Sequence, residues 1–156
     1  MRIGVISDTH RNASCIEALE GKIKALDILI HLGDNVDDIS LIRKYYNGRI
    51  INVKGNCDFS ASTPYDRVED IYGKRIFLTH GHRYNVKEGL HKLRDKALET
   101  GADIVLYGHT HIGQIDFEGG IWYVNPGSAS EPRDGGRSFV IIDIAGECIE
   151  PNLIRF

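Results

Sequence analysis

The sequence has few cysteines, and none of them form a close pair. Cys15, Cys57 and Cys148 lie far apart in the chain and make no CxxC motif. An odd number of widely spaced cysteines is not the framework of a small secreted domain, in which disulfides supplement a limited core. We therefore expect a reduced, cytoplasmic protein that depends on packing for its stability.

The sequence also has no excess of positive charge and no long hydrophobic run. It contains 19 Lys and Arg against 22 Asp and Glu, for a formal net charge of −3. Basic patches are the usual electrostatic signature of nucleic-acid binding, so nucleic acid is not indicated as a partner. No apolar stretch approaches the ~20 residues of a membrane span, and no signal peptide precedes the first strand-like run. We expect no membrane partner.

Internal repeats, low-complexity segments and linkers are absent from the 156 residues. This length is enough to bury a real hydrophobic core without a disulfide or a structural metal. The simplest prediction is one domain over residues 1–156.

Apolar runs alternate with helical patterns in the first third of the chain. The predicted strands are 3–6, 28–30 and 50–53, and the predicted helices are 13–25 and 38–46. Asn12 is placed to cap the first helix. A β-α-β-α-β order with apolar strands predicts a parallel sheet covered by helices, and hence the α/β class.

The rest of the chain predicts three hairpins and one more helix and strand. The predicted hairpins join 69–71 to 75–79, 114–117 to 121–125, and 138–144 to 147–153. Asn85 followed by Glu88 resembles a capping box and predicts a helix over 86–100, before a buried strand at 104–107. We expect a mixed sheet system, parallel early and antiparallel late.

Unusual polar residues follow five of the predicted strands, at the point where each strand ends. The clusters are Ser7-Asp8-Thr9-His10, Gly33-Asp34-Asn35, Gly55-Asn56-Cys57-Asp58, His80-Gly81-His82 and Gly108-His109-Thr110-His111. Five of the seven histidines lie in them. Ligands gather at the carboxyl ends of parallel strands, so we expect these side chains to converge.

Imidazole and carboxylate groups together favour a metal site. This donor set suits zinc, manganese, iron or nickel. The candidates are too many for one ion and match two ions that share a carboxylate. Two metals about 3.5–4 Å apart can clamp an in-line displacement at phosphorus and lower the pKa of water to about 7. We expect His109 and His111 to bracket the pair, one for each ion.

In order and spacing, these motifs resemble the calcineurin-like metallophosphoesterases, and more closely their small YfcE-type phosphodiesterase branch. The matching segments are SDTH, HLGD, GNCD, THGH, GHTH and NPGS, which span nearly the whole chain. The resemblance implies a four-layer α/β/β/α sandwich with two mixed β-sheets. It also places two metals at the sheet edge.

The resemblance implies a ligand set and a reaction as well. The implied ligands are Asp8, His10, Asp34 and His111 for the first metal, and Asn56, His80 and His109 for the second, with Asp34 shared. We expect two divalent ions, with manganese favoured and nickel, zinc, iron or cobalt as alternatives. The implied reaction is hydrolysis of a small phosphoester, a diester in particular, by a metal-bridging hydroxide that attacks phosphorus in line.

Cys57 departs from the wider family, which has a histidine beside the asparagine ligand to assist the leaving oxygen. A thiol gives no cationic donor, so we expect diesters or activated esters rather than esters with poor leaving groups. Our candidate catalytic residues are Asn56, Cys57, Asp58 and His82. A turn or positioning role is the alternative for Asp58, and a loop role for His82.

Three arginines are candidate contacts for a substrate phosphate. Arg11, Arg133 and Arg137 could reach a substrate phosphate or lie in solvent.

A non-catalytic scaffold is the alternative function, because the eukaryotic retromer subunit shares the implied fold and works as a binding module. This chain keeps all seven candidate ligands, which favours the enzyme. Edge strands near the termini could pair in a homodimer.

Overall fold

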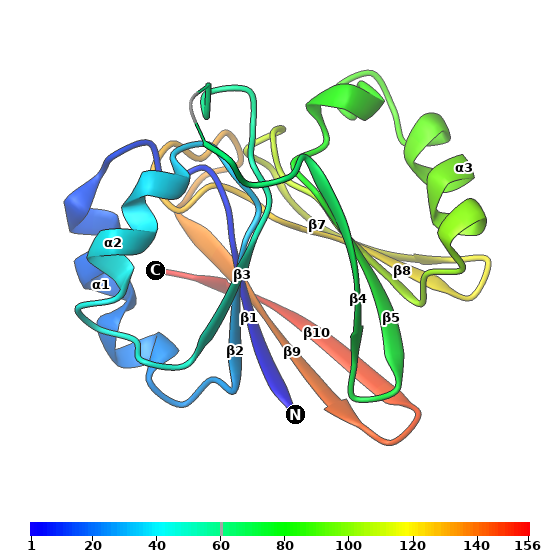
Figure 1. Ribbon diagram of the computed structural model, residues 1–156, viewed down its shortest axis with the longest axis horizontal. Coiled ribbons are helices and arrows are strands. Elements are labelled where there is room, and N and C mark those ends of the chain that lie inside the picture. The colour runs from blue at the N-terminus through cyan, green and yellow to red at the C-terminus, as the bar shows by residue number, and fades with distance from the viewer. Residues whose placement is uncertain (60) are drawn as a thin grey trace.

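The protein, described by a computed structural model over residues 1–59 and 61–156, is a sandwich of two mixed five-stranded sheets. Helices α1 (Ala13–Ile23) and α2 (Ile39–Ile42) cover the outer face of one sheet, and α3 (His91–Thr100) covers the other (Figure 1). The four layers confirm the α/β/β/α fold implied by the sequence motifs.

The first sheet has the strand order β10-β9-β1-β2-β3. Its strands are β1 (Arg2–Ile6), β2 (Ile28–His31), β3 (Arg49–Asn52), β9 (Ser138–Ala145) and β10 (Cys148–Arg155). The strands β1, β2 and β3 are parallel, while β9 runs antiparallel to both β1 and β10. The last hairpin of the chain therefore completes the sheet that the first three strands begin.

The second sheet has the strand order β4-β5-β6-β8-β7. Its strands are β4 (Asp66–Ile71), β5 (Lys74–Thr79), β6 (Ile104–Leu106), β7 (Gly113–Glu118) and β8 (Ile121–Pro126). The central strands β5, β6 and β8 are parallel, and β4 and β7 join as antiparallel hairpin partners. The expected division into parallel early and antiparallel late strands is wrong, because β5, β6 and β8 in the later part of the chain are also parallel.

The three predicted hairpins and the cap of α1 are confirmed. The side chain of Asn12 accepts a hydrogen bond from the Cys15 N–H at 3.3 Å, which satisfies an otherwise free donor of the first turn. The hairpin between β4 and β5 turns at Tyr72 and Gly73, both with positive φ of 52° and 76°. Such a turn matches the right-handed twist of the two strands.

Two predicted helices are shorter in the structure. The segment predicted as a helix over 38–46 contains only α2, which follows a 3₁₀ helix over Val36–Asp38. The capping box at Asn85 is wrong: this residue has a φ of 53° and ends a 3₁₀ helix over His82–Tyr84. The Glu88 N–H donates to the Asn85 carbonyl at 2.8 Å in a turn, and α3 begins only at His91.

Alternation along the strands separates the hydrophobic core into layers. Ile3 and Val5 of β1 pack between the two sheets with Leu78 and Leu106, whereas Ile6 packs against α1. Full burial of such side chains stabilises the fold by ~1.5–3 kcal/mol each. The inter-sheet layer presses the sheets together and brings their strand ends into one rim.

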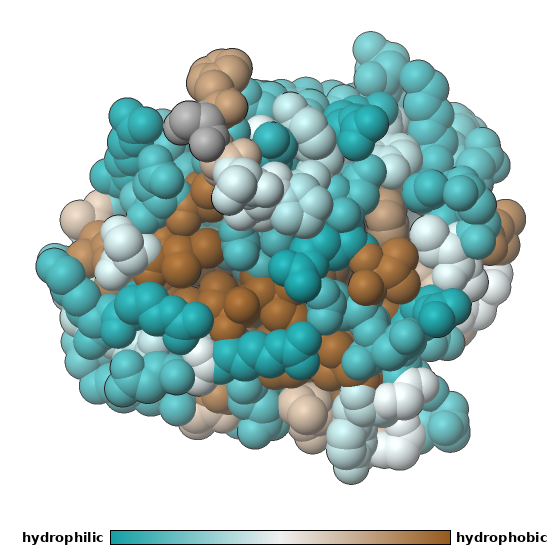
Figure 2. Space-filling model, in the orientation of Figure 1, coloured by the Kyte–Doolittle hydropathy of each residue, from teal (hydrophilic) through white to brown (hydrophobic). Residues whose placement is uncertain are grey.

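The edge strands β3 and β4 of the two sheets lie next to each other. Arg49 and Glu69 form an ion pair of 2.9 Å between them, and the Asn52 amide donates to Thr63 at 2.9 Å. On the face shown in Figure 2, hydrophobic side chains form a band bordered by polar ones. No helix within the described residues is long and apolar enough to cross a membrane.

Candidate metal centre

The loops after β1 and β6 bring one group of ligand atoms together. Asp8, His10 and His111 each offer an atom within 4.8 Å of the others. The Nε2 atom of His111 lies 3.1 Å from Oδ1 of Asp8, and the Nε2 atoms of His10 and His111 are 3.4 Å apart. Asp8 is fully buried and His111 nearly so, whereas His10 is half-buried.

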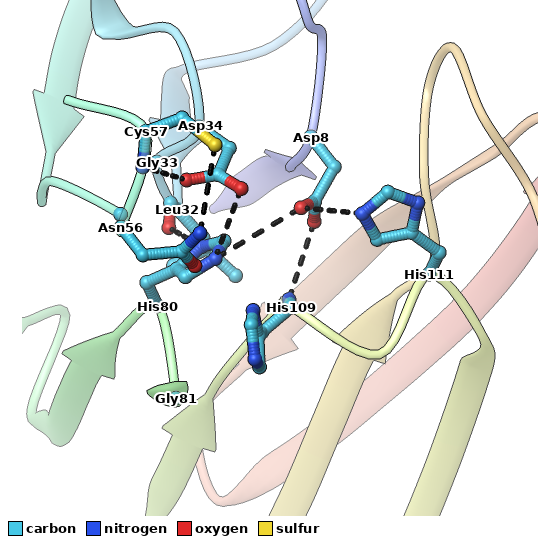
Figure 3. Close-up of polar contacts among 12 residues, drawn as sticks. Asp8, Leu32, Gly33, Asp34, Asn56, Cys57, His80, Gly81, His109 and His111 are labelled. Atoms are coloured by element: carbon cyan, nitrogen blue, oxygen red, sulfur yellow. Dashed lines mark hydrogen bonds and ion pairs between the residues drawn. The ribbon is translucent and has the colours of Figure 1, made fainter. Parts of the chain in front are cut away.

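The loops after β2, β5 and β6 bring a second group together. Asp34, His80 and His109 also have ligand atoms within 4.8 Å of one another. The Nε2 atom of His80 lies 3.5 Å from Oδ2 of Asp34 and 3.9 Å from Oδ1 of Asp8 (Figure 3). Asp34 forms a further group with His10 and Cys57, so its carboxylate lies between ligands of both groups.

Two of the histidine rings have their orientation set by backbone carbonyls. The Nδ1 atom of His80 lies 2.9 Å from the Leu32 carbonyl oxygen, and Nδ1 of His111 lies 2.7 Å from that of Glu131. A carbonyl can only accept, so each Nδ1 carries the proton and donates it. The lone pair of each neutral ring is then on Nε2, which faces the carboxylates. This arrangement is typical of histidines that bind metals.

Electrostatics keep both carboxylates ionised. Burial opposes the charge of Asp8, but the contact with His111 and the charge of His80 outweigh it and hold the pKa of that carboxyl below its usual range. For Asp34, burial is likewise outweighed by His80, and its pKa is well below the usual value. Burial and the charge of His80 lower the pKa of His109 to about 4. The carboxylates in turn raise the pKa of His80, against its burial, and the contact with Asp8 raises the pKa of His111. The centre therefore combines anionic oxygens with imidazoles that attract positive charge.

The residues present fit divalent cations. Oδ1 of Asp8 and Nε2 of His80 are buried side-chain atoms without a hydrogen-bond partner. Lone pairs of imidazole and carboxylate groups that face each other at 3.1–3.9 Å repel one another unless a ring proton or a metal cation lies between them. A set of nitrogen and oxygen donors of this kind suits zinc, manganese, iron or nickel.

The ligand loops have an unusual backbone conformation. Five of the candidate ligands have φ between 45° and 69°: Asp8, His10, Asp34, His109 and His111. This left-handed conformation costs a residue other than glycine ~1–2 kcal/mol. The surrounding contacts must offset the strain. One of these contacts requires glycine, because a Cβ at Gly55 would lie 2.1 Å from Oδ1 of Asp34.

Asp58 holds the Asp34 loop from behind. Its two oxygens accept four backbone hydrogen bonds of 2.8–2.9 Å, from the N–H groups of Asp34, Asn35, Val36 and Gly55. Both oxygens are directed at backbone, and the residue is buried. In this position Asp58 orients the loops after β2 and β3 relative to each other.

The NPGS segment, Asn125 to Ser128, also supports the ligand loops. The hydroxyls of Ser128 and Ser130 both donate to the Asp8 carbonyl, at 2.9 and 2.8 Å. The Asn125 amide donates to the Gly108 carbonyl and to the Thr110 hydroxyl, both at 3.0 Å. The signal that could have found this role is position, since the segment begins within the last two residues of β8, at the same rim.

A buried network around His31 was also not predicted. The Gly33 N–H donates to Nδ1 of His31 at 3.1 Å, so the proton of this neutral ring is on Nε2, which lies 3.1 Å from the Thr9 hydroxyl. Thr9 in turn donates to Asp38 at 2.6 Å, and the Arg11 N–H donates to the same oxygen at 2.9 Å. The network joins the loop of Asp8 and His10 to the loop of Asp34.

The remaining candidates lie around the ligand groups. The Cys57 N–H donates to Oδ1 of Asp34 at 2.9 Å, and burial together with the Asp34 charge raises the pKa of the Cys57 thiol to about 11. The exposed Asn56 places its amide nitrogen 3.5 Å from the Cys57 sulfur. The ring of His82 stands 5.5 Å from that of His80 and 6.1 Å from that of His109.

The three arginines are spread over different surfaces. Arg11 lines a small pocket of about 80 Å³ together with Cys57 and Asp58. Arg133 lines a groove beside the loop of His109 and His111. Arg137 lies 3.5 Å from the Ser14 hydroxyl, at the start of α1. Arg11 and Arg133 therefore border surfaces next to the metal centre.

A sandwich of two mixed sheets with such ligand groups at their common rim defines the class of metallophosphoesterase-fold proteins. Residues 1–147 match the family described as the calcineurin-like phosphoesterase superfamily domain, and the chain belongs to this family. It is 33% identical, over 99% of its length and 92% of the relative's, to a "Probable metallophosphoesterase" of Methanothermobacter thermautotrophicus. It is 35% identical to the "Phosphodiesterase YfcE" of Escherichia coli K12, over 56% of this chain and 48% of that protein.

Solved structures show the same fold. A conserved uncharacterized protein of Streptococcus pneumoniae TIGR4, described as a predicted phosphoesterase, superposes with a TM-score of 0.85 at 30% identity, over 99% of this chain and 88% of that one. Vps29 of Entamoeba histolytica complexed with Zn²⁺ superposes with a TM-score of 0.77 at 20% identity, over 99% of both chains. The second likeness concerns the fold alone.

Proposed function

We propose that this protein is a phosphodiesterase that binds two divalent cations. The observation that carries the proposal is the pair of buried, unpartnered atoms, Oδ1 of Asp8 and Nε2 of His80, at the meeting point of the ligand groups. Membership in the calcineurin-like phosphoesterase family supports the same conclusion. Asp8, His10 and His111 would hold one cation and Asn56, His80 and His109 the other, with Asp34 shared.

The chain's own residues would organise the reaction around these cations. When bound, two such cations supply a nucleophile from water near neutral pH and neutralise charge on the phosphoryl oxygens. Asp34 would orient both halves of the centre, and Asp58 would hold Asp34 in place through the backbone. His82, beside His80 and His109, would contact the phosphoryl group from the second half of the centre.

The thiol of Cys57 would limit which esters are cleaved. With a pKa raised to about 11, it is protonated at neutral pH and remains a weak, uncharged donor. A leaving alkoxide needs a proton, whereas a stabilised leaving group departs without one. The proposed substrates are therefore diesters with good leaving groups rather than alkyl monoesters.

The nitrogen and oxygen donors also support manganese as the proposed metal, with nickel, zinc, iron and cobalt as competitors. Cys15, Cys57 and Cys148 are free thiols, which supports the proposed cytoplasmic location. A metal panel distinguishes the ions: the protein is stripped, reloaded with each one, and assayed on bis-(p-nitrophenyl) phosphate.

The test of function compares the parent protein with Asp34→Ala. We expect the parent to bind about two metal ions and to cleave the aryl diester, because two groups of ligands are present. The variant should lose both metal and turnover. An Asp95→Ala variant, altered on the exposed face of α3, is the matched control. Tight metal binding without turnover on any phosphoester would instead favour the non-catalytic scaffold.

A further inference from the structure

A groove lies beside the candidate metal centre, along the segment that precedes α3. Its walls include Val86, Lys87, Leu90, Thr110, Ile112 and Arg133. Its volume of about 560 Å³ falls in the ~300–1,000 Å³ range of small-molecule sites. Thr110 stands between His109 and His111 in the chain, so the groove adjoins the centre.

The groove has two cations on its walls. The ion pairs of residues 1–59 and 61–156 involve neither Lys87 nor Arg133. Glu88 also lines the groove, so positive charge exceeds negative charge by one. The groove is therefore suited to an anion.

Both cations belong to segments that are fixed to the ligand loops. The Arg133 N–H donates to the His111 carbonyl at 3.0 Å. Val86, the neighbour of Lys87, packs closely on Gly81. A Cβ added to Gly81 would lie 2.8 Å from Cγ2 of Val86. Each cation is thus held close to the ligand loops.

The two cations lie on the same groove as the loop of the ligand histidines. Lys87 and Arg133 line it together with Thr110, which stands between His109 and His111 in the chain. An anion that attaches to a phosphorus at the centre and extends along the groove would meet both positive charges.

Apolar side chains line the groove together with the two cations. Val86 is buried, Leu90 is half-buried, and Ile112 is 43% exposed although it is apolar. A ligand that covers Ile112 removes its side chain from water, which favours binding. The groove therefore combines contact area for carbon atoms with charge for an anionic end.

We propose that this groove binds the ester arm that remains on phosphorus, and that this arm carries a second anionic group. The inference rests on the proposed function and adds a substrate class, namely phosphodiesters with a further negative charge on one arm. The charged arm is the one retained, because an alkoxide that already bears an anion is the poorer leaving group.

The test compares two diesters that share a p-nitrophenyl leaving group. One has a carboxyethyl group as its other arm and the other has a propyl group, so the two differ in charge more than in size. The parent should show a higher kcat/KM for the carboxyethyl ester than for the propyl ester, because its KM for the carboxyethyl ester is lower. The variants Lys87→Met and Arg133→Met should each reduce this preference roughly two- to fivefold, the range of a partly exposed charge contact.

Two further variants separate charge in the groove from charge elsewhere. Lys22→Met removes a cation from the exposed face of α1 and should keep the parent's preference. Glu88→Gln removes the acidic group of the groove and should raise the preference. In addition, calorimetry on the protein without added metal should show tighter binding of carboxyethyl phosphate than of propyl phosphate, and Lys87→Met should weaken that difference.

Other outcomes contradict the inference. Equal kcat/KM of the parent protein on the carboxyethyl and propyl esters would overturn it. An equal loss of activity on both esters in Lys87→Met and Arg133→Met would also overturn it, because that result indicates a structural role for these residues. Failure of the proposed function looks different: the parent cleaves neither ester with any metal, and this is seen before a variant is made. Equal affinity for carboxyethyl phosphate and propyl phosphate in calorimetry would overturn the proposed role of the groove independently of any activity assay.

Discussion

The Nε2 atom of His111 lies 3.1 Å from Oδ1 of Asp8, while the other ring nitrogen of His111 is held by the Glu131 carbonyl at 2.7 Å. The carbonyl fixes one proton on Nδ1, so in the neutral ring two acceptors face each other across that distance, and Asp8 raises the pKa of His111 because a second proton on Nε2 relieves this contact. The same relationship recurs between His80 and Asp34 at 3.5 Å. A cation relieves both contacts, and this sets the first prediction.

Metal binding should stabilise the fold. At a free metal concentration ~100 times the Kd, binding contributes about 2.7 kcal/mol, which corresponds to a rise in Tm of roughly 5–10 °C for a chain of this size. Differential scanning fluorimetry of stripped and reloaded protein measures it. Asp34→Asn should lose most of the rise, and Asp95→Asn should keep it. An unchanged Tm in the reloaded parent would count against a cation at this site.

Asp58→Asn should weaken metal binding through the backbone. An amide has one acceptor oxygen, so its nitrogen would face N–H groups that the carboxylate now accepts. We expect a loss of at least about 3 kcal/mol of unfolding free energy and a ~10–100-fold weaker metal affinity. Urea unfolding and metal titration measure the two effects, with Asp95→Asn as the control. Parent-like values in both measurements would show that these four hydrogen bonds do not hold the loop.

Cys57→His should shift the enzyme toward monoesters. A histidine at this position can donate a proton to the leaving oxygen, whereas a thiol with a pKa of about 11 is a poor proton donor. General acid assistance is worth ~100–10,000-fold, so the ratio of monoesterase to diesterase kcat/KM should rise by at least about tenfold. Cys148→His, on an exposed cysteine of β10, is the control. If the ratio stays constant, Cys57 plays no part in leaving-group protonation.

Asp134 should contribute a pH-dependent part of the stability. The Arg155 guanidinium at 2.9 Å outweighs partial burial, and the Gly113 N–H at 2.7 Å adds to it, so the pKa of Asp134 is below its usual 3.8. A depressed pKa in the folded state gives stability that is present above the unfolded value and is lost as the pH falls through the folded value.

Asp134→Asn should therefore be less stable than the parent by up to about 1 kcal/mol at neutral pH. The difference should shrink as the pH falls below 3.8. Urea unfolding of both proteins across this range measures it, at constant ionic strength. A difference that is the same at every pH would assign the effect to packing instead of charge.

The sequence alone determined much about this protein. Apolar periodicity located every strand of both sheets within a few residues. The clusters after β1, β2, β3, β5 and β6 identified the polar residues that meet, because strand ends of a parallel sheet share one edge. These patterns are local in the sequence, so they can be recognised without knowledge of the three-dimensional structure.

Tertiary structure decided how those residues are arranged. Only tertiary contacts place Asp34 between His10 and His80, turn the oxygens of Asp58 toward the backbone of a neighbouring loop, and put Lys87 and Arg133 on the walls of one groove. The late start of α3 at His91 is likewise a tertiary result, since Val86 packs on Gly81 and holds the preceding turn out of the helix. Such contacts join segments remote in the chain, and no local periodicity encodes the distance between them.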